Sequence, residues 1–307
     1  MTVTSPPAPP THEDPGAWIN QQAMSGRRRV TNALATSWMI GSLLLALVPV
    51  VVIAVYVVSR GASVMSIGFL TKNLQIVTQL AGGGIAPAIV GTLVITGVAA
   101  AMAIPLGILA AVYLNEYGRQ NRTATVIRFM ADVMTGVPSI VMGLFVATIW
   151  VSSGLHSGYS GFAGSLALGA LMLPIVIRST EEMLKLVPDD LRQASDALGA
   201  RRWRTVVSVA LPAALPGVVS GAMLAVARAA GETAPLLLTI GTTNVINSNP
   251  FKGTNTTLSK VIWDNAQTPF PASTDRAWGA ALTLIVIVFV FTVVARIVSS
   301  RFATVKR

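Results

Sequence analysis

Residues 191–212 read LRQASDALGARRWRTVVSVALP, and this stretch decides how the rest of the chain is interpreted. Its first part is rich in residues that favour helices, and it ends at a glycine, Gly199. The second part carries three arginines and runs into an apolar segment that ends at Pro212. The pattern predicts two short helices that meet at Gly199, where a residue without a Cβ permits a sharp turn.

Composition indicates that this helical unit belongs to a membrane protein. Of the 307 residues, 53% are hydrophobic and only 11% are charged, whereas soluble domains carry about 25% charged residues. Much of the surface must therefore face lipid. The formal net charge of +10 does not favour a nucleic-acid partner, because Lys and Arg also accumulate in the cytoplasmic loops of membrane proteins.

The N-terminal residues 1–33 are polar and proline-rich, with the run SPPAPPTHEDPG, and predict a disordered cytoplasmic tail. Three arginines at 27–29 precede an apolar run, as in a secretory signal peptide. Residues 30–59 contain no charge, however, and this run is too long for a signal sequence and long enough to span a bilayer. We therefore expect the first membrane helix here.

Five more apolar segments predict membrane helices, which makes six in all within residues 34–300. They lie at about 86–115, 125–153, 162–186, 213–240 and 277–298. Three of them contain a proline, Pro105, Pro138 or Pro174, which we expect to kink the helix, since neighbouring helices can satisfy the freed carbonyl groups. Small residues recur along the segments and let helix backbones approach closely. The sequence thus predicts an all-α bundle.

Lys and Arg are distributed unevenly between the predicted loops. With the N-terminus inside, sixteen of them fall on the cytoplasmic side and five on the outer side. The positive-inside rule then places both termini, including the short tail 301–307, and the 191–212 unit in the cytoplasm. The polar segment 241–276 is placed outside, where it is either a docking surface for a binding protein or an inert connector. Within it, LSKVIWDNA is compatible with one short helix.

Several kinds of site are missing from the sequence. It has no cysteine, and His12 and His156 lie outside the apolar runs, which excludes thiolate chemistry and an intramembrane imidazole. No G-x-x-x-x-G-K-[ST] phosphate loop occurs, so any ATP and Mg²⁺ that are used must bind to a partner chain. We expect this chain to bind no cofactor or metal ion and to have no enzymatic activity of its own.

The 191–212 unit resembles the EAA loop of ABC-transporter permeases. In that family EAA is followed by three residues, Gly, nine residues, a β-branched aliphatic residue, one residue and Leu-Pro. The residues at these positions here are Gln193, Ala194, Ser195, Gly199, Val209, Leu211 and Pro212. Gln193 stands where the family has Glu, so the first position offers no acidic contact, and Ser195 stands where the family has Ala.

This resemblance implies that residues 188–212 contain a coupling helix, which docks onto a cytoplasmic ATPase and transmits its closure to the membrane bundle. Ala194 and Ser195 would keep the first helix slim enough to lie in a groove. Arg201 and its neighbours would offer positive charge to the partner and to lipid headgroups. The alternative is an amphipathic connecting helix in which the pattern arises by chance.

Longer runs resemble the phosphate-specific ABC transporter permeases. They are GGGIAPAIVGTLVIT (82–96), IPLGILAAVYLNEYG (104–118), GVPSIVMGLF (136–145), LPIVIRSTEEMLKLVP (173–188) and ARAAGETAPLLLTIG (227–241). The runs AGETAPLLLT and GGIAPAIVGT resemble the PstA-type subunit more than its PstC-type partner. The resemblance implies the six-helix bundle of an ABC importer type I permease and a role in the ATP-driven import of inorganic phosphate.

The same resemblance implies a bacterial inner-membrane location and a set of partners. They are a second permease of the PstC type, two copies of a PstB-type ATPase and an external phosphate-binding protein of the PstS type. Three alternatives remain open. A permease for sulfate or molybdate would have the same coupling loop, a secondary carrier would need no such loop, and a membrane enzyme would need catalytic groups that are missing here.

Arg228 and Glu232 lie four residues apart in the fifth predicted helix, and so on one face of it. A charge within the membrane is costly and is rarely retained without a partner or a pathway. The planar guanidinium offers two parallel hydrogen bonds to an oxyanion. The functional interpretation is that Arg228 meets phosphate in transit and Glu232 neutralises it when the path is empty, and the alternative is a structural ion pair.

A second charged cluster lies at the cytoplasmic end of the fourth predicted helix. There Arg178 is spaced to pair with Glu181 or Glu182. It is either a residue that extends toward the interface from the helix end or, with Glu182, a contact for phosphate at the exit. Arg128 and Asp132, again four apart, are interpreted as an interfacial pair at the start of the third helix.

Overall fold

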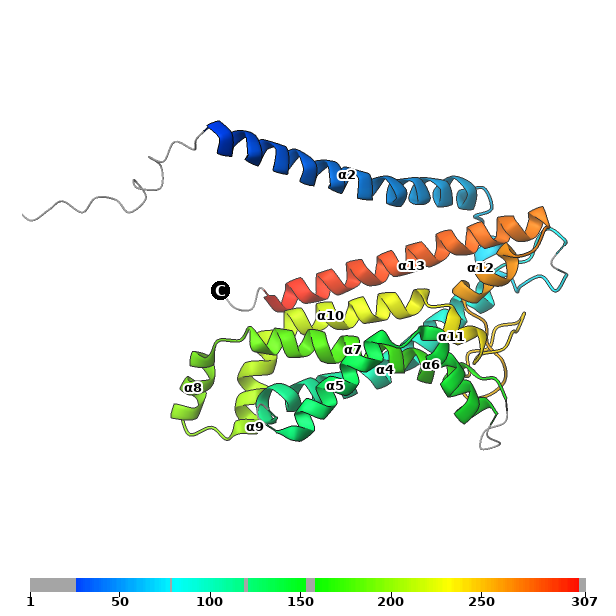
Figure 1. Cartoon of the computed structure of the whole chain (residues 1–307). Coiled ribbons are helices and arrows are strands. Elements are labelled where there is room, and N and C mark those ends of the chain that lie inside the picture. The colour runs from blue at the N-terminus through cyan, green and yellow to red at the C-terminus, as the bar shows by residue number, and fades with distance from the viewer. Residues whose placement is uncertain (1–25, 78, 119–120, 153–157, 304–307) are drawn as a thin grey trace, which may run out of the picture. The chain divides into compact units, whose positions relative to one another are not determined.

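The computed structural model describes residues 26–77, 79–118, 121–152 and 158–303. The chain divides into two compact units, residues 1–56 and 57–307, which are described separately. All regular secondary structure in the described ranges is helical (Figure 1). The predicted all-α class is therefore confirmed for this part of the chain.

The described part of the first unit is one helix. It is the N-terminal part of α2 (Gly26–Ala62), in which the stretch Val30–Ala62 reaches a mean hydropathy of 2.7. Every side chain described between residues 27 and 56 is exposed, as expected of an apolar helix that faces lipid. The predicted first helix is confirmed, and it is long and apolar enough to cross a membrane. Residues 26–33 belong to this helix and not to the predicted tail, and residues 1–25 of that tail lie outside the described residues.

Five helical segments of the described chain are long and apolar enough to cross a membrane, and one bent pair adds a sixth candidate. After α2 come α4 (Ala86–Val112) with its π-helical end η1 (Tyr113–Tyr117), and α7 (Gly161–Lys185). They are followed by a span made of α9 (Arg202–Thr205), η3 (Val206–Ala210) and α10 (Leu211–Gly231), and by α13 (Pro271–Ala303).

The third predicted helix, 125–153, is wrong as one continuous helix. The chain forms α5 (Arg122–Gly136), then α6 (Ser139–Val146) and its π-helical end η2 (Ala147–Val151), with a bend of 106° between them. Val137 and Pro138 are extended, with ψ of 127° and 135°. Proline disfavours the helical conformation of the preceding residue and cannot donate a backbone hydrogen bond, so the break falls where Pro138 is.

The fifth predicted helix, 213–240, is wrong at both ends. It begins upstream, because α9 and η3 continue into α10 without a break. It ends at Gly231, and Glu232 has an extended ψ of 133° before the short α11 (Ala234–Leu237). Pro235 accounts for this end, since it lacks the N–H that would bond to the carbonyl of residue 231 and its ring clashes with that carbonyl.

The core of the second unit lies where α4, α7 and α10 pack together. Its buried residues are mostly small or aliphatic, among them Ala99, Met172 and Ala225. Glycines allow the helix backbones to come close, because a Cβ on Gly107 of α4 would lie 2.6 Å from a methyl carbon of Val176 in α7. This packing confirms the predicted bundle, and small residues are the usual device for it in membranes.

The polar segment 241–276 packs into the second unit instead of forming an open loop. The predicted short helix is confirmed as α12 (Leu258–Ala266). Asn255, Thr256 and Thr257 before it are almost fully buried, and the backbone N–H of Leu258 donates to Thr92 Oγ1 in α4 at 2.9 Å. A further helix that the sequence analysis missed, α3 (Ile67–Thr71), is capped by Ser66.

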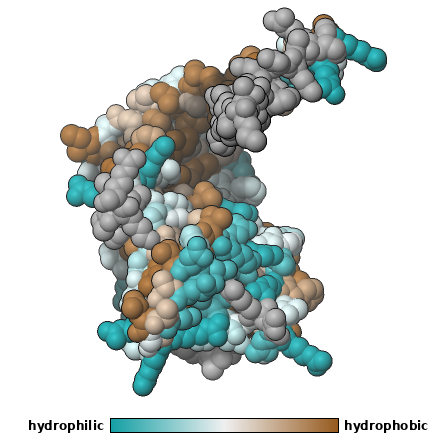
Figure 2. Space-filling view, turned by 90° about the vertical axis from the view of Figure 1, so that its left-hand side faces the viewer, coloured by the Kyte–Doolittle hydropathy of each residue, from teal (hydrophilic) through white to brown (hydrophobic). Residues whose placement is uncertain are grey.

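The charged loop between α7 and α10 contains α8 (Asp189–Ala197), the turn at Gly199 and α9. Figure 2 views the molecule from the side on which this loop lies in Figure 1, and hydrophilic side chains gather there. The same end of the second unit holds the ends of α4 and α7 and the start of α5. It is therefore the polar end that a soluble partner would meet.

Candidate substrate pocket and coupling loop

A pocket of about 250 Å³ lies among α5, α6, α7 and α10. The break in the third span gives it one wall, since Thr135, Pro138 and Ser139 lie on either side of the 106° bend. Leu171, Met172, Pro174 and Ile175 of α7 form a second wall, and α10 contributes the third with Ala225, Arg228, Ala229 and the adjoining Glu232. The lining thus combines an apolar floor with one cation, one acid and two hydroxyl groups.

The structure brings Arg228 and Glu232 together at this pocket, as their spacing predicts. Arg228 Nε lies 3.8 Å from Glu232 Oε1, and the two side chains are 69% and 22% exposed. This distance is too long for a hydrogen bond, and in the described part of the chain the Arg228 guanidinium has no hydrogen-bond partner. Its donors are therefore free to meet an anion.

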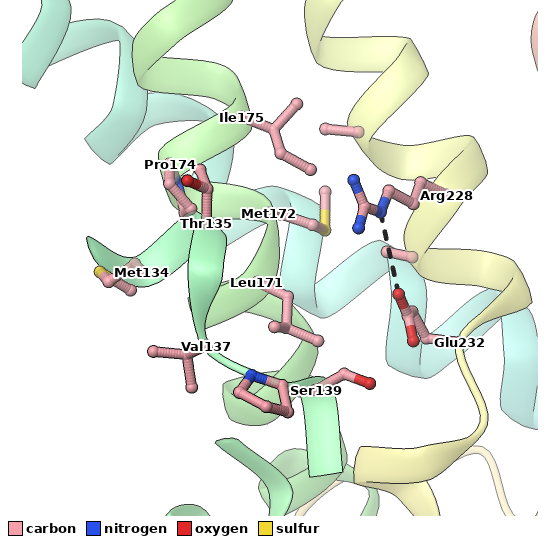
Figure 3. A pocket seen from close by; sticks show the side chains of 13 residues that line it. Met134, Thr135, Val137, Ser139, Leu171, Met172, Pro174, Ile175, Arg228 and Glu232 are labelled. Carbon is pink, nitrogen blue, oxygen red and sulfur yellow. Dashed lines mark ion pairs between the residues drawn. The ribbon is translucent and has the colours of Figure 1, made fainter. Parts of the chain in front are cut away.

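The position of Glu232 differs from the prediction. It does not lie in the interior of a helix but caps the C-terminal end of α10, where the backbone is extended. Figure 3 shows its carboxylate beside Arg228, with the hydroxyl of Ser139 pointing toward it from the start of α6. Ser139 and Thr135 were not selected from the sequence. The only signal for them was their position beside Pro138, where the chain turns.

The charged cluster along α5 and α7 is paired differently from the prediction. Arg178 bonds to Asp132 of α5, not to Glu181 or Glu182 of its own helix. Arg128 donates to Glu181 Oε1 at 2.8 Å, not to Asp132. The prediction from spacing within one helix was wrong, because α5 packs against α7 and each charge pairs with an opposite charge on the neighbouring helix.

These pairs differ in burial and in distance from the pocket. Glu181 is fully buried, and it also accepts a salt bridge from Lys185 at 2.9 Å. Arg178 and Asp132 are about half exposed, one helical turn beyond the pocket residues Ile175 and Thr135. Glu182 is exposed and lies away from the pocket. The structure therefore does not unite Arg178 and Glu182 with Arg228 and Glu232 in one site.

The predicted coupling loop has the geometry expected of it around Gly199. This glycine has a φ of +76°, which disfavours residues with a side chain, and nothing lies within 4 Å of where its Cβ would be. Its N–H donates to Asp196 O at 2.9 Å and closes the end of α8. Across the turn, the hydroxyl groups of Ser195 and Thr205 lie 2.9 Å apart and hold the two helices together.

The remaining predicted coupling residues lie along this loop. Gln193 and Ala194 are exposed on α8, and Arg201 is exposed at the residue before α9. Leu211 and Pro212 begin α10, so they belong to the membrane span and not to a separate short helix. Leu198 and Trp203 are 88% and 57% exposed, which leaves apolar surface on the loop for a partner.

No group of three or more His, Asp or Glu residues in the described ranges is arranged to hold a metal ion. His12 and His156 lie outside those ranges.

Comparison with known proteins places this architecture in a family. Residues 103–304 match the profile of the binding-protein-dependent transport system inner membrane component. The chain is 44% identical over 283 residues to the phosphate transport system permease protein PstA 1 of Mycobacterium tuberculosis, which covers 92% of both chains. It is 46% identical over 267 residues to the PstA protein of Mycobacterium leprae, covering 86% of this chain and 87% of the relative.

Solved structures agree in fold. A bacterial ABC transporter involved in the import of the acidic polysaccharide alginate matches with a TM-score of 0.59 at 16% identity, over 89% of this chain and 99% of the other. The MetNI methionine ABC transporter, in inward-facing conformations, matches with a TM-score of 0.57 at 18% identity, over 71% and 94%. From the profile match and the identities to its relatives, this chain belongs to the binding-protein-dependent transport system inner membrane components, among the PstA permeases.

Proposed function

We propose that this chain is one of two permease subunits of an ATP-driven importer of inorganic phosphate, and that the pocket at Arg228 is its half of the substrate path. The observation that carries the proposal is the Arg228 guanidinium, which is 69% exposed beside a pocket inside a membrane protein. A cation in that position is costly unless it has a close partner or serves a pathway, and Glu232 at 3.8 Å is too far to be hydrogen-bonded to it. The names of its PstA relatives support phosphate as the substrate.

The chemistry of the pocket suits a tetrahedral oxyanion. The guanidinium can give two parallel charge-assisted hydrogen bonds to two phosphate oxygens. The Ser139 hydroxyl adds a neutral donor from the broken span, whereas the Thr135 hydroxyl donates to Asp132 O at 2.6 Å. Glu232, 3.8 Å from Arg228, balances its charge when the pocket is empty and weakens the binding of an anion by repulsion.

We propose further that the chain crosses the inner membrane six times, with both termini in the cytoplasm. The bent pair α5 and α6 would then be the third crossing. This arrangement is supported by the excess of Lys and Arg in the loops on the proposed inner side. It places α8, the Gly199 turn and the polar end of the second unit on the cytoplasmic side.

In this arrangement α8 docks onto an ATPase subunit that binds ATP and Mg²⁺, two copies of which serve the two permeases. The external side, with α12 and the buried segment before it, faces a phosphate-binding protein. The second permease, of the PstC type, supplies the opposite wall of the pathway. The chain itself binds no cofactor and hydrolyses no ATP.

The test is anion uptake by the assembled complex in proteoliposomes. With the binding protein outside and ATP inside, labelled phosphate should accumulate, and excess unlabelled sulfate or molybdate should not compete. This chain reconstituted alone should take up none. Uptake by the single chain would support a secondary carrier. Competition by sulfate or molybdate would indicate that the substrate is another oxyanion.

A further inference from the structure

The coupling helix α8 has little packing of its own. None of its nine residues is buried, and Leu191 and Leu198 near its ends are exposed. Packing alone would let such a helix move while the membrane helices stay in place. It can transmit a movement only if specific contacts join it to the bundle.

Arg192 supplies those contacts, with a side chain that is only 12% exposed. Its Nη2 donates to Glu116 Oε1 at 3.1 Å and to Leu184 O at 2.9 Å. Its Nη1 donates to Val187 O at 2.7 Å and to Asp189 Oδ1 at 3.0 Å. Glu116 lies in η1 at the end of α4 and Leu184 lies near the end of α7, so one side chain joins α8 to two helices of the core.

Glu116 is the partner on which these contacts converge, and its side chain is 6% exposed. Besides Arg192, its Oε1 accepts a hydrogen bond from Asn115 Nδ2 at 2.8 Å. Its backbone carbonyl accepts one from Arg202 of α9, and the Arg202 guanidinium lies 5.3 Å from the centre of the Tyr117 ring. The end of α4 is thus held from both sides of the Gly199 turn.

We propose that Glu116 and Arg192 are positioning residues that make α8 and the cytoplasmic ends of α4 and α7 into one rigid block. A force on α8 then moves the core helices instead of bending the loop. The inference rests on the proposed function, since it needs an ATPase that acts on α8. Of the four bonds that the planar guanidinium makes, those to Glu116 and Leu184 join α8 to the core helices, and a flexible ammonium group cannot reproduce both.

The experiment measures phosphate taken up per ATP hydrolysed by the assembled complex in proteoliposomes. Glu116→Gln and Arg192→Lys should each lower this ratio by about tenfold, within the usual range of coupling between sites, while hydrolysis continues. Asp189→Asn is the matched control. It removes the other carboxylate bonded to Arg192, but Asp189 is 64% exposed and lies on α8 itself. Its ratio should stay within about twofold of the unchanged protein.

A normal uptake ratio in both Glu116→Gln and Arg192→Lys would overturn the proposal. A complex of unchanged sequence that takes up no phosphate would refute the proposed function and not the block. A second measurement addresses the block directly and leaves its residues intact. Spin labels at Asp190→Cys in α8 and Leu109→Cys in α4 report the distance between the two helices, and the chain has no cysteine of its own to interfere.

This distance should be the same with ATP bound and without nucleotide, because the block moves as a unit. A shift between the two states would show that α8 moves independently of α4, which would overturn the inference even if the Glu116 variant fails to assemble. Both labelled positions are exposed and outside the contacts that form the block.

Discussion

Two Arg–Glu pairs in the second unit are built from the same residue types and differ in almost every other respect. Arg128 and Glu181 join α5 to α7 at 2.8 Å, and the carboxylate is fully buried. Arg228 and Glu232 lie 3.8 Å apart at the end of α10, with the guanidinium 69% exposed. The residues of the first pair are 53 positions apart in sequence and lie on two helices, whereas those of the second are four positions apart.

The difference lies in what remains available on each guanidinium. Arg128 also donates from Nη2 to Leu114 O at 2.8 Å, and Glu181 is shared with Lys185. Both residues of this pair thus make a further bond, and together they join η1 at the end of α4 to α5 and α7. Arg228 has no such partners among the described residues and faces a pocket. An ion pair that is loose and exposed inside a membrane bundle is therefore the better candidate for a substrate contact than a tight one.

The largest effect is expected for the loose pair, when Arg228 is changed to Gln. Uptake by the assembled complex should fall by roughly 10- to 150-fold, since a hydrogen bond to a charged group contributes about 1.5–3 kcal/mol. Arg228→Lys keeps the charge and loses the planar fork, so it should retain intermediate uptake. Both complexes should assemble normally, which size-exclusion chromatography checks.

The double variant Arg228→Gln, Glu232→Gln separates the two interpretations of this pair. Removing one partner of a purely structural pair leaves an uncompensated charge, and removing both does not. Near-normal uptake by the double variant would therefore reject a role in the substrate path. Loss of uptake in a well-assembled complex is the result that the pathway interpretation requires.

A smaller effect, on stability and not on transport chemistry, is expected for the tight pair. Glu181→Gln leaves Arg128 and Lys185 without their acid. Breaking a buried pair costs about 3–5 kcal/mol, which we reduce to about 2 kcal/mol because Arg128 is partly exposed. The melting temperature of the complex should fall measurably. Glu182→Gln, at the exposed neighbouring acid, should leave it unchanged. An equal fall in both would contradict the distinction.

The sequence predicts the spans well and their interruptions poorly, as two prolines show. Pro174 lies inside the continuous α7, whereas Pro138 lies within the bend of 106° between α5 and α6. Hydropathy does not distinguish the two cases, since both segments are apolar along their length. What decides it is tertiary: α7 is packed between α4 and α10, whereas the turn at Pro138 lines the pocket. The shape of the pocket could therefore not be predicted from the sequence.

The turn between α8 and α9 was predictable because its pattern is local, with Gly199 at a fixed distance from its neighbours. The contacts that tie it to the bundle were not. Glu116 and Arg192 are 76 residues apart, and nothing near either residue in the sequence indicates the other. The same limit explains the wrong partners given to Arg178 and Arg128. Spacing identifies charges on one helix face and cannot identify the helix that packs against that face.

The smallest effect is expected for the third pair, Arg178 and Asp132, which adjoins the pocket and is 41% and 49% exposed. Asp132→Asn should change the free energy of unfolding by less than about 1 kcal/mol, because exposed pairs contribute little. Its uptake should also be near normal, whether or not Arg178 meets phosphate on its way out, since the cation stays in place.

Arg178→Gln then decides between the two roles left open for this arginine. If Arg178 contacts phosphate at the exit, the Arg178→Gln complex should lose uptake, whereas the Asp132→Asn complex should keep it. If Arg178 is only structural, Arg178→Gln and Asp132→Asn should change uptake by the same small amount. Equal and near-normal uptake by the two variants would confine the substrate contacts of this chain to the pocket at Arg228, and a selective loss in Arg178→Gln would extend the path one helical turn along α5 and α7.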